Sequence, residues 1–442
     1  MNEPLKAVGC HVFAGGFTLG VRQVMQVEDH LETHGFGIET AEKVVGVRVT
    51  NCEDYREWPA LSGNMLFGNP RCTGFSCITS GCKESAHGPW SKQTIDIHEL
   101  SDYAAKGGYD AIVWESVQQA YTGTGKALID WLIERHYAPA GYRVAHILLN
   151  AASFGNAQQR KRYFFVAYKN DKAFNITPPK ISSFYSTTYD AIWNLRDRIT
   201  REAKDRDDFD ADTYVKLSPH EKRCAERLPN GWNLNMLANY DYDALPDKFK
   251  KTWDTRTSKM PFSLHCIHRL QWLHPFPTIH SGASRWIHPW YNRPITVLEA
   301  ATAMGWGGLV PIGRAPIPQI GKGIVPDIGR WLAEQVKLYL TDAWGGDDWE
   351  SSYDHVEGEW KGRDTHGELE KTFNMTKYVG HYFDAERYHY DARIPRHRWN
   401  VDPNTGRLKR PWKEIRESYR GDPRVDRLVR KASLMREDVP NE

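Results

Sequence analysis

The amino-acid sequence predicts a doubly wound α/β domain that is interrupted by a second, irregular module. Short apolar runs alternate with amphipathic stretches from residue 7 to residue 168, and from about 170 to 276 this pattern breaks into short polar pieces. Two further helical segments follow residue 293. Strand–helix alternation is typical of a mainly parallel sheet with helices on both faces. Two helices after an irregular insertion indicate that the chain returns to its first domain.

The individual elements follow from local patterns. The predicted strands lie in AVGCHVFAGG (7–16), GFGIET (35–40), NMLFGN (64–69), DAIVWES (110–116), RVAHILLN (143–150) and RYFFVAY (162–168). Apolar residues recur at helical spacing in ALIDWLIERHY (127–137), PITVLEAATAMGW (294–306) and PDIGRWLAEQVKLYL (326–340). We therefore expect residues 1–169 and 277–341 to form one domain in two parts. Residues 170–276 form the irregular module, and 342–442 a charged C-terminal extension.

Composition excludes several classes of protein. The chain has 442 residues, of which 40% are hydrophobic and 12% aromatic, too many for a disordered chain. No apolar run reaches the roughly 18 residues that cross a bilayer, so we expect no membrane association. The seven cysteines are an odd number and are mostly scattered, which is typical of reduced thiols in a cytoplasmic protein.

The formal net charge of +2 conceals two oppositely charged segments. Residues 342–391 contain thirteen acidic side chains against five basic ones, whereas residues 393–436 contain fourteen basic against five acidic. The basic segment fits contacts with the phosphates of a polyanion. A solvated helical tail of mixed charge would give the same pattern.

The first predicted strand ends in a glycine-containing turn, FAGGFTLG, that leads into a helix. Glycines at this point let the backbone approach a nucleotide-like ligand at the carboxyl end of a strand, although a simple tight turn has the same sequence. The next predicted strand ends at Glu39, where a carboxylate can accept both hydroxyls of a ribose.

Cys72 lies in the loop NPRCTGFS directly after the strand NMLF. A cysteine at the carboxyl end of a strand is placed to act as a nucleophile. Two other interpretations remain: a small buried apolar side chain, or a zinc ligand with Cys77 and Cys82, although no CxxC pair or matching histidine pair accompanies them.

Glu115 ends another predicted strand, in WESV, where a buried carboxyl could stay partly protonated and hydrogen-bond a ring nitrogen. Arg160 and Arg162 follow Gln158 and Gln159 and occupy alternate positions where the next predicted strand begins. Alternate positions of a strand lie on the same face. Two guanidinium groups on one face require an anion or a carbonyl oxygen as partner.

Taken in order, these segments resemble the DNA cytosine-5 methyltransferase family. FAGG is similar to its first motif, NPRCTGFS to its Pro-Cys motif, WESV to its Glu-Asn-Val motif and QQRKR to its QxRxR motif. FPTIHSG with IHPWYNRPITVLEAATAMGW resembles the ninth motif, and IGKGIVPDIGRWLAEQV the tenth. The resemblance covers about residues 8–340, apart from the family's variable target recognition domain. It implies a Rossmann-like fold that depends on S-adenosylmethionine.

The resemblance also implies a mechanism. Cys72, as thiolate, would attack carbon 6 of a cytosine that is flipped out of double-stranded DNA. Glu115 would hold position 3 of the ring, Arg162 would contact the carbonyl oxygen, and Arg160 would organise the nucleophile loop. Carbon 5 would then take the transferred group, lose its proton and release Cys72. No metal is needed. The implied cofactor-binding residues are Phe13, Ala14, Gly15, Gly16, Leu19, Glu39, Pro70, Arg71, Lys322 and Ile324.

Four positions depart from the family pattern. The first motif is two residues shorter than FAGxGGxxxG, Arg71 replaces a proline, Ser116 replaces the asparagine of Glu-Asn-Val, and Lys322 replaces the asparagine of the tenth motif. Cations at 71 and 322 are unfavourable beside a sulfonium unless an anion lies between them. Carboxy-S-adenosylmethionine would supply that anion, and the product would be 5-carboxymethylcytosine. Alternatively, methyl transfer is retained, Lys322 faces solvent or pairs with Asp327, and Arg71 contacts a DNA phosphate.

Residues expected to contact DNA are Ser76, Gln158, Lys250, Lys251, Arg256 and Arg269. The last four lie in a basic and aromatic part of the irregular module, which surface charge around core aromatics explains equally well. We expect a monomer on double-stranded DNA in the cytoplasm of a bacterial or phage-infected cell, acting in restriction–modification or in phage genome modification. A catalytically silent DNA-binding homologue and an RNA cytosine-5 methyltransferase are the alternatives.

Overall fold

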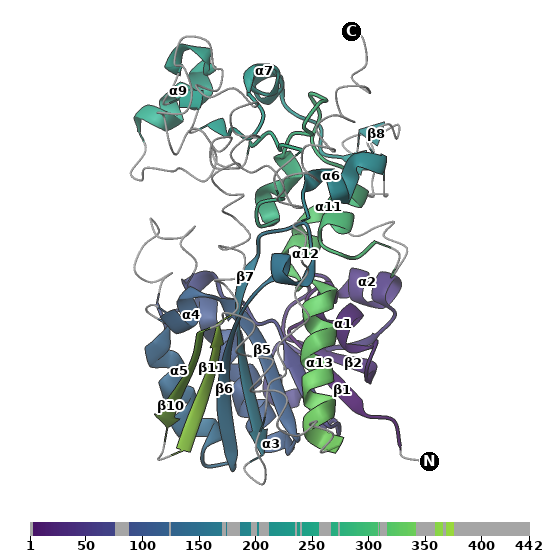
Figure 1. Cartoon of the computed structure of the whole chain (residues 1–442), viewed down its shortest axis with the longest axis vertical. Coiled ribbons are helices and arrows are strands. Elements are labelled where there is room, and N and C mark those ends of the chain that lie inside the picture. The colour runs from purple at the N-terminus through teal and green to yellow at the C-terminus, as the bar shows by residue number, and fades with distance from the viewer. Residues whose placement is uncertain are drawn as a thin grey trace, which may run out of the picture.

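The computed structural model describes residues 3–75, 88–122, 125–169, 174, 186–195, 201–202, 212–234, 237–238, 241–255, 267–272, 275–307, 309, 316–341, 359–365 and 368–374. In this part of the chain, one large mixed sheet and its helices form the lower body in Figure 1, and a smaller helical module lies above the sheet. No helix in these ranges has the length and apolar character that spanning a membrane requires.

The large sheet has nine strands in the order β10-β11-β6-β7-β5-β4-β1-β2-β3. Their bounds are β1 Lys6–Cys10, β2 Gln26–Glu32, β3 Arg48–Asn51, β4 Met65–Gly68, β5 Ala111–Val117, β6 Tyr142–Asn150, β7 Lys161–Lys169, β10 Glu359–Thr365 and β11 Glu368–Asn374. Strands β3, β2, β1, β4 and β5 are parallel, and β7 runs antiparallel between β5 and β6. The predicted doubly wound, Rossmann-like fold is therefore confirmed.

Alternate residues of the central strands belong to two separate hydrophobic cores. On β5, Ala111 and Val113 pack on one face of the sheet, whereas Ile112 and Trp114 pack on the other. The first face is covered by α1 (Gly16–Val21), α11 (Val297–Ala303), α12 (Ile317–Lys322) and α13 (Pro326–Thr341). The second face is covered by α3 (Ile95–Gly107) and α5 (Lys126–Leu132), which continues into a π-helical turn at Ile133–Tyr137. Burial on both faces explains why these strands are almost uniformly apolar.

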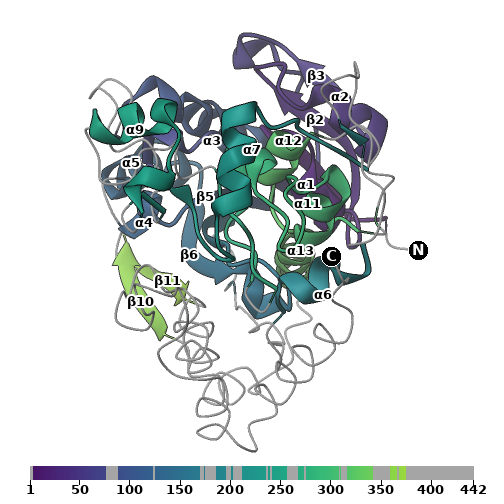
Figure 2. The same ribbon diagram turned by 90° about the horizontal axis from the view of Figure 1, so that it is seen from above.

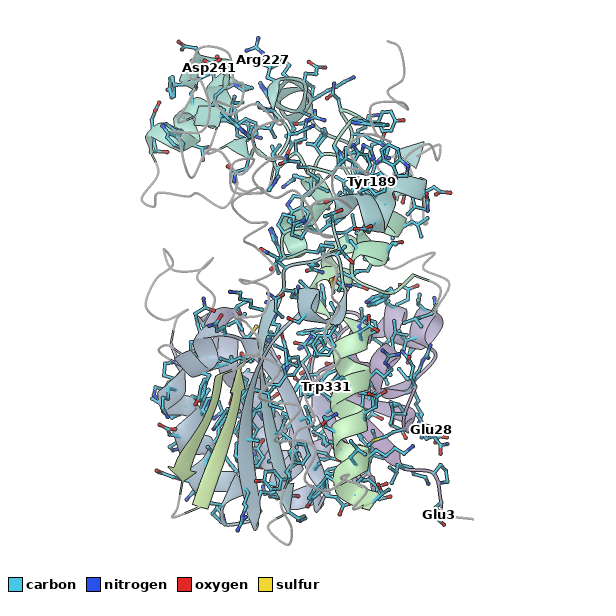
Figure 3. The ribbon with its side chains drawn as sticks, viewed as in Figure 1. Glu3, Glu28, Tyr189, Arg227, Asp241 and Trp331 are labelled. Carbon is cyan, nitrogen blue, oxygen red and sulfur yellow. The ribbon has the colours of Figure 1, made fainter. Side chains whose placement is uncertain are left out.

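Helix α13 packs against α1, the short helix that follows the turn after β1. Helix α13 runs beside the sheet in Figure 3, and its Trp331 packs edge to face on Phe154. A Cβ atom at Gly20 of α1 would lie 2.1 Å from the carbonyl oxygen of Pro326, and one at Gly16 would lie 2.8 Å from that of Ile324. Glycine is therefore required where the two helices cross, because any side chain would clash with backbone.

The upper module has its own small core. Helices α7 (Pro219–Arg227) and α9 (Asp247–Asp254) contribute to this cluster, and Trp232 and Leu245 lie in the segments between them. Ser218 begins α7 with a capping box, in which its side chain and that of Glu221 satisfy each other's backbone N–H groups. Helix α6 (Thr188–Ile192) lies between this module and the sheet (Figure 1).

The remaining elements are short. They are α2 (Ile38–Thr40), a π-helical turn (Ala41–Val45), α4 (Gln119–Thr122), β8 (Arg201–Glu202) with β9 (Thr213–Tyr214), and 3₁₀ turns at Tyr55–Glu57, Thr73–Phe75, Lys92–Thr94, Ala151–Phe154, Trp193–Leu195, Tyr242–Ala244 and Ser281–Arg285.

One prediction about an element was wrong. GFGIET does not form the second strand: Gly37 has a φ of 88°, and α2 begins directly after it. The second strand is β2 instead, whose first half is polar and only partly covered, so it lacks a strong apolar pattern. Within the predicted charged C-terminal extension, β10 and β11 pair with each other, and β11 lies beside β6 (Figure 2).

Candidate active site

Four predicted catalytic residues converge at one edge of the sheet. Cys72 follows β4, Glu115 lies near the end of β5, and Arg160 and Arg162 lie at the start of β7. Because β7 is antiparallel to β5, its start meets the carboxyl end of β5, and Arg162 is in register with Val117. We call Cys72, Glu115, Arg160 and Arg162 the catalytic cluster.

The surroundings of Cys72 keep its thiol protonated. Burial and the charge of Glu115 raise its pKa to about 11, although the charges of Arg162 and Arg160 and a main-chain hydrogen bond from Val117 act in the opposite direction. The residue as a whole is only partly buried, so the thiol is shielded while the residue reaches the surface. The Cys72 thiol therefore needs a change of local charge to ionise near neutral pH.

Glu115 and Arg162 form an ion pair. Arg162 Nε lies 2.6 Å from Glu115 Oε1, and the glutamate side chain is 2% exposed. Burial raises the pKa of Glu115 despite the two arginines that oppose the shift. A buried carboxyl with a raised pKa can act as a proton donor to a ring nitrogen.

Arg160 joins three segments that are distant in sequence. Its guanidinium donates to the carbonyl oxygens of Ile279 (3.0 Å), Gly321 (3.1 Å) and Gly323 (2.8 Å). The side chain is fully enclosed, and burial together with the charge of Arg162 lowers its pKa to about 9. Arg160 therefore fixes the segments that resemble the ninth and tenth motifs against the catalytic cluster.

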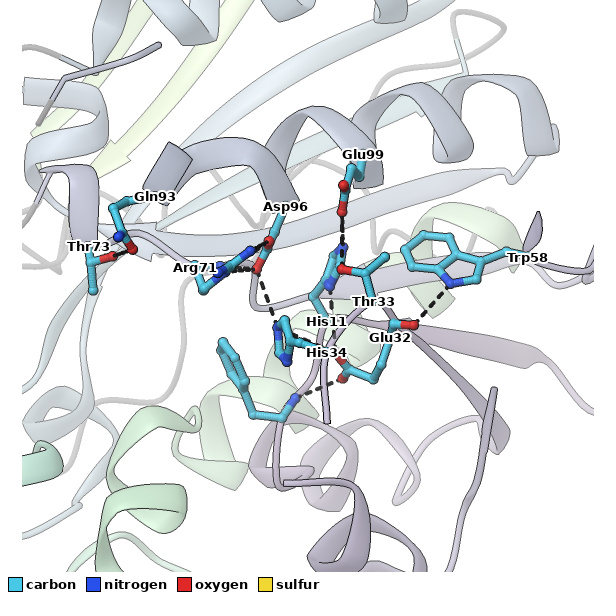
Figure 4. Close-up of polar contacts among 11 residues, drawn as sticks. His11, Glu32, Thr33, His34, Trp58, Arg71, Thr73, Gln93, Asp96 and Glu99 are labelled. Carbon is cyan, nitrogen blue, oxygen red and sulfur yellow. Dashed lines mark hydrogen bonds and ion pairs between the residues drawn. The ribbon is translucent and has the colours of Figure 1, made fainter. Parts of the chain in front are cut away.

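The nucleophile loop is held from both sides. Asn69 Nδ2 donates to the carbonyl oxygen of Lys322 at 2.8 Å. On the other side Arg71 forms a bidentate pair with Asp96 of α3, shown in Figure 4: Nε is 2.9 Å from Oδ1 and 2.8 Å from Oδ2, and Nη2 is 2.5 Å from Oδ1. Arg71 is thus paired with a protein carboxylate, a partner that the sequence did not indicate.

The glycine turn after β1 contains residues with a positive φ and is tied to the end of β2. Phe13 has a positive φ of 54°, and its N–H donates to Glu32 Oε1 at 3.1 Å. The second oxygen, Glu32 Oε2, is buried and accepts no hydrogen bond from the described residues, since His11 Nδ1 lies 3.6 Å and His34 Nε2 3.9 Å away. Gly15 has a φ of 89°, which side chains avoid. The other predicted cofactor residues here, Ala14, Gly16, Leu19, Pro70 and Ile324, are all buried.

The structure corrects the position of the acid after the second strand. Glu39 does not end a strand; it lies on α2, is 65% exposed and pairs with Lys43 at 2.8 Å. Glu32, which ends β2, is the acid that faces the turn. The misplaced strand explains this error.

Lys322 faces the same region instead of solvent. Its Nζ lies 3.8 Å from the ring centre of Phe36 and 5.5 Å from that of Phe13. Burial and the charge of Arg71 lower its pKa. Asp327, one alternative partner, lies 3.4 Å from Arg330 instead, and no carboxylate of the described residues is within 4.0 Å of Lys322 Nζ. We call Phe13, Glu32, Phe36 and Lys322 the donor cluster.

Two histidines lie between the donor cluster and the Arg71–Asp96 pair. His34 Nε2 is 3.5 Å from Asp96 Oδ2, and His11 lies between Glu32 (3.6 Å) and Glu99 (3.5 Å), as Figure 4 shows. Burial lowers the pKa of His11, but the two glutamates outweigh burial and raise it to about 9. Donor atoms of His11, His34 and Asp96 lie within 4.8 Å of one another, close enough to hold a metal ion, but Asp96 already binds Arg71.

Two residues predicted to contact DNA are buried. Gln158 is fully enclosed and hydrogen-bonds the backbone N–H of Ile279 at 2.9 Å. Arg269 is 5% exposed and donates to the carbonyl oxygens of Leu228 (2.8 Å) and His288 (2.9 Å). Both side chains therefore hold backbone segments together in the free protein, and their contact with DNA stays a prediction.

The other predicted DNA and zinc residues have different outcomes. Lys251 is exposed on α9, and Lys250 lies 3.3 Å from Asp243. Ser76, Arg256, Cys77 and Cys82 lie outside the described residues.

Glu32, His34 and Asp96 are site residues that the sequence analysis did not single out. The position of Glu32 in the sequence does point to it. It lies about twenty residues after the first strand, in a polar segment where a second strand could be predicted. Nothing in the sequence points to Asp96 in this way, because a single acid at the start of a helix usually serves only the helix dipole.

Comparisons with known proteins agree with this geometry. Residues 40–337 match the model of a family described as C-5 cytosine-specific DNA methylase. The type II methyltransferase M.DdeI of Desulfomicrobium norvegicum is 25% identical over 327 residues, which cover 66% of this chain and 75% of that protein. The type II methyltransferase M1.BsuMI of Bacillus subtilis is 29% identical over 175 residues, covering 38% and 36%. A crystal structure of a putative DNA modification methyltransferase from an E. coli prophage shares the fold with a TM-score of 0.50, at 19% identity, covering 76% of this chain and 99% of that one.

Proposed function

Because the chain belongs to the C-5 cytosine-specific DNA methylase family, we propose that it transfers a one-carbon-derived group to carbon 5 of cytosine in double-stranded DNA. The observation that supports this most directly is the catalytic cluster, in which a cysteine, a buried glutamate and two arginines meet at one sheet edge. A catalytically silent homologue would not need to keep a nucleophile together with all of its partners.

The donor cluster fits S-adenosylmethionine, the cofactor of this family. Glu32 Oε2 is a buried acceptor whose neighbours among the described residues, His11 Nδ1 at 3.6 Å and His34 Nε2 at 3.9 Å, lie beyond hydrogen-bond distance, so a ribose hydroxyl would satisfy it. The ring of Phe13 and the crowded glycine turn would flank the adenosyl group. When bound, the cofactor supplies an electrophilic carbon on a sulfonium. The residues that would hold it are Phe13, Gly15, Glu32, Pro70 and Lys322.

The catalytic cluster would act on a cytosine that is flipped out of the duplex. Cys72 Sγ would form a bond to carbon 6, and the electron pair displaced from the 5,6 double bond would make carbon 5 nucleophilic. Glu115 would hydrogen-bond position 3, and Arg162 the carbonyl oxygen. After transfer, carbon 5 would lose its proton and the Cys72–carbon 6 bond would break, which restores the ring.

The charges around Cys72 suggest how the nucleophile is activated. The negative charge of Glu115 is one cause of the raised thiol pKa, whereas Arg162 and Arg160 lower it. If Glu115 is protonated when it meets the cytosine, its opposing charge disappears and the two arginines favour the thiolate. Activation is then coupled to entry of the base.

Trapping tests this proposal. Duplex DNA containing 5-fluorocytosine should form a covalent complex with the protein in the presence of S-adenosylmethionine or carboxy-S-adenosylmethionine, because after transfer the fluorine at carbon 5 cannot leave as a proton does. We expect Cys72→Ala to abolish the complex and Cys52→Ala, a control at another partly buried cysteine, to retain it. A complex with fluorinated RNA alone would indicate an RNA enzyme, and no complex with either would indicate a silent homologue.

Lys322 favours a second candidate, in which the transferred group is carboxymethyl from carboxy-S-adenosylmethionine. Its ammonium lies over aromatic rings without a carboxylate partner among the described residues. A carboxylate on the transferable group would pair with it. Mass spectrometry of nucleosides from DNA treated with each donor distinguishes the two. Formation of methylcytosine alone, unaffected by Lys322→Asn, would contradict the carboxymethyl candidate.

The proposal extends to the oligomeric state, the cellular location and the biological role of the protein. We propose that the protein acts as a monomer on DNA in the cytoplasm of a bacterial or phage-infected cell, with Lys250 and Lys251 contacting phosphates. Protection of DNA in a restriction–modification system is the role that the names of its relatives suggest. Modification of a phage genome is the other role proposed.

A further inference from the structure

We propose that Asp96 determines donor specificity by neutralising Arg71, so that Lys322 is the cation that the donor meets. The inference rests on the proposed function and concerns the charge of its donor site. It assigns Asp96 a positioning and charge-compensating role, with no contact to the reacting atoms.

Arg71 and Asp96 form a bidentate ion pair beside Cys72. Asp96 accepts from the guanidinium of Arg71 through both oxygens and from the Arg71 backbone N–H at 3.2 Å. Bidentate arginine–carboxylate pairs are the strongest and most specific side-chain ion pairs. Since Arg71 directly precedes Cys72, the same contacts fix the nucleophile loop.

The carboxylate of this pair is much more deeply buried than the guanidinium. The Asp96 side chain is 0% exposed, whereas that of Arg71 is 36% exposed. Burial would raise the pKa of Asp96, but His34 and Arg71 outweigh it and keep the pKa well below its usual range. The carboxylate thus stays charged at any pH at which the protein works, and Arg71 stays paired.

Lys322 and Arg71 differ in the partners that surround their positive charges. Both cations depart from the family pattern, and each influences the other, since the charge of Arg71 lowers the pKa of Lys322. Arg71 has a buried carboxylate partner, whereas within the described ranges Lys322 Nζ contacts the rings of Phe36 and Phe13 and is influenced by Asp96 only from a longer distance. The donor site therefore presents one uncompensated cation where the sequence suggests two.

The consequence is a defined effect on donor choice. S-adenosylmethionine carries a positive sulfonium, S-adenosylhomocysteine lacks that charge, and carboxy-S-adenosylmethionine adds a carboxylate beside it. Removing the Asp96 charge with Asp96→Asn would leave Arg71 unpaired. We expect it to weaken binding of S-adenosylmethionine about tenfold relative to S-adenosylhomocysteine, and to favour the carboxylated donor over both.

The test is isothermal titration calorimetry of the three ligands with the full-length protein, without DNA, which reads binding and not turnover. The double variant Arg71→Gln/Asp96→Asn removes both charges and should restore the wild-type ratio of affinities. Arg71→Gln alone leaves an extra anion and should shift the ratio toward S-adenosylmethionine, which keeps the test valid if Asp96→Asn does not fold. Asp102→Asn, on the same helix and outside the site, is the matched control.

Two results would contradict the proposal in distinguishable ways. If the ligands bind but Asp96→Asn and Arg71→Gln both leave the affinity ratio within twofold of the wild type, Asp96 has no role in specificity and the proposed function is untouched. If the unmodified protein binds none of the three ligands, the proposed function is overturned and this inference with it.

Discussion

Cys72 is surrounded by groups whose charges oppose one another, so its reactivity in the free protein differs from that of an ordinary thiol. Burial and Glu115 raise its pKa to about 11, against two arginines that lower it. Near neutral pH the free thiol is almost entirely protonated, which protects it from oxidants and electrophiles when no substrate is bound.

The first prediction concerns alkylation of this thiol. Between pH 7 and 10 the thiolate fraction, and with it the rate of reaction with iodoacetamide, should rise about tenfold per pH unit. Peptide mass spectrometry after timed quenching measures the rate at Cys72 separately from the other cysteines. Glu115→Gln should accelerate the reaction, because it removes a charge that raises the pKa. A rate that levels off below pH 9 would contradict the raised pKa.

A second residue-scale prediction concerns Arg160. Arg160→Ala leaves the carbonyl oxygens of Ile279, Gly321 and Gly323 without their donor and opens a cavity. We expect the free energy of unfolding to fall by about 3 kcal/mol, measured by urea denaturation. The exposed Arg135→Ala is the control and should change it by less than about 0.5 kcal/mol. Equal changes in the free energy of unfolding for the two variants would show that Arg160 does not stabilise the contact between these segments.

Residues of the site differ in how far the sequence predicts them. Cys72 follows one strongly apolar strand and Glu115 lies near the end of another, so their place at the sheet edge is predictable from local pattern. Glu32 ends a strand whose own residues are polar, and Asp96 is recognised only through Arg71, 25 positions away. Pairing between distant residues depends on tertiary structure and leaves no local signal.

At the scale of elements, one hydrogen bond joins α1 to β2 in the core. Thr18 Oγ1 and His30 Nε2 are 2.7 Å apart, and both side chains are fully buried. Burial lowers the pKa of His30 to about 3, so the imidazole in the native protein is neutral over most of the working pH range.

The third prediction is a pH optimum of stability set by two histidines of opposite sign. Below pH 6.5 the unfolded chain binds a proton that native His30 does not, so the His30 contribution is lost as pH falls from 6.5 toward 3. His11, with a pKa raised to about 9, binds a proton that the unfolded chain releases, and its contribution is lost as pH rises from 6.5 through 9. Each contributes a slope of about 1.4 kcal/mol per pH unit within its window.

Urea denaturation at a series of pH values measures both slopes. His30→Gln should flatten the acid side and His11→Gln the alkaline side. If each variant alters the opposite side, or neither side, the assignment of the two histidines is wrong.

At the scale of the whole molecule, the small net charge of +2 is a poor guide to DNA binding, because the charges are unevenly distributed. The described part of the upper module presents the exposed Lys251 on α9, whereas Arg269 of the same module is buried and structural. Counting basic residues in a segment therefore overestimates its surface charge.

The fourth prediction is a change in the salt dependence of DNA binding. If Lys251 contacts a phosphate, Lys251→Gln should weaken binding similarly for all sequences and reduce the slope of log K against log salt by about 1. Fluorescence anisotropy at several salt concentrations measures this slope. Lys106→Gln, an exposed lysine at the end of α3, is the matched control. An unchanged slope for Lys251→Gln would remove Lys251 from the DNA surface.

The overall architecture was predictable because the central strands are buried on both faces and their apolar runs stand out. The edges of the sheet were not. Strands β2 and β3 are partly exposed, and β10–β11 lies in a segment whose acidic composition does not suggest strands. Edge strands lose the apolar signal because only part of their surface is covered.

The crossing of α1 and α13 also bears on the order in which the protein can mature. Gly16 and Gly20 need backbone from residues 324–326 beside them, and Arg160 needs carbonyl groups up to Gly323. A nascent chain that has not yet released α13 from the ribosome therefore lacks both the finished glycine turn and the anchor of the catalytic cluster. Synthesis itself therefore delays the appearance of activity until α13 docks, so a chain that ends before α13 should not modify DNA.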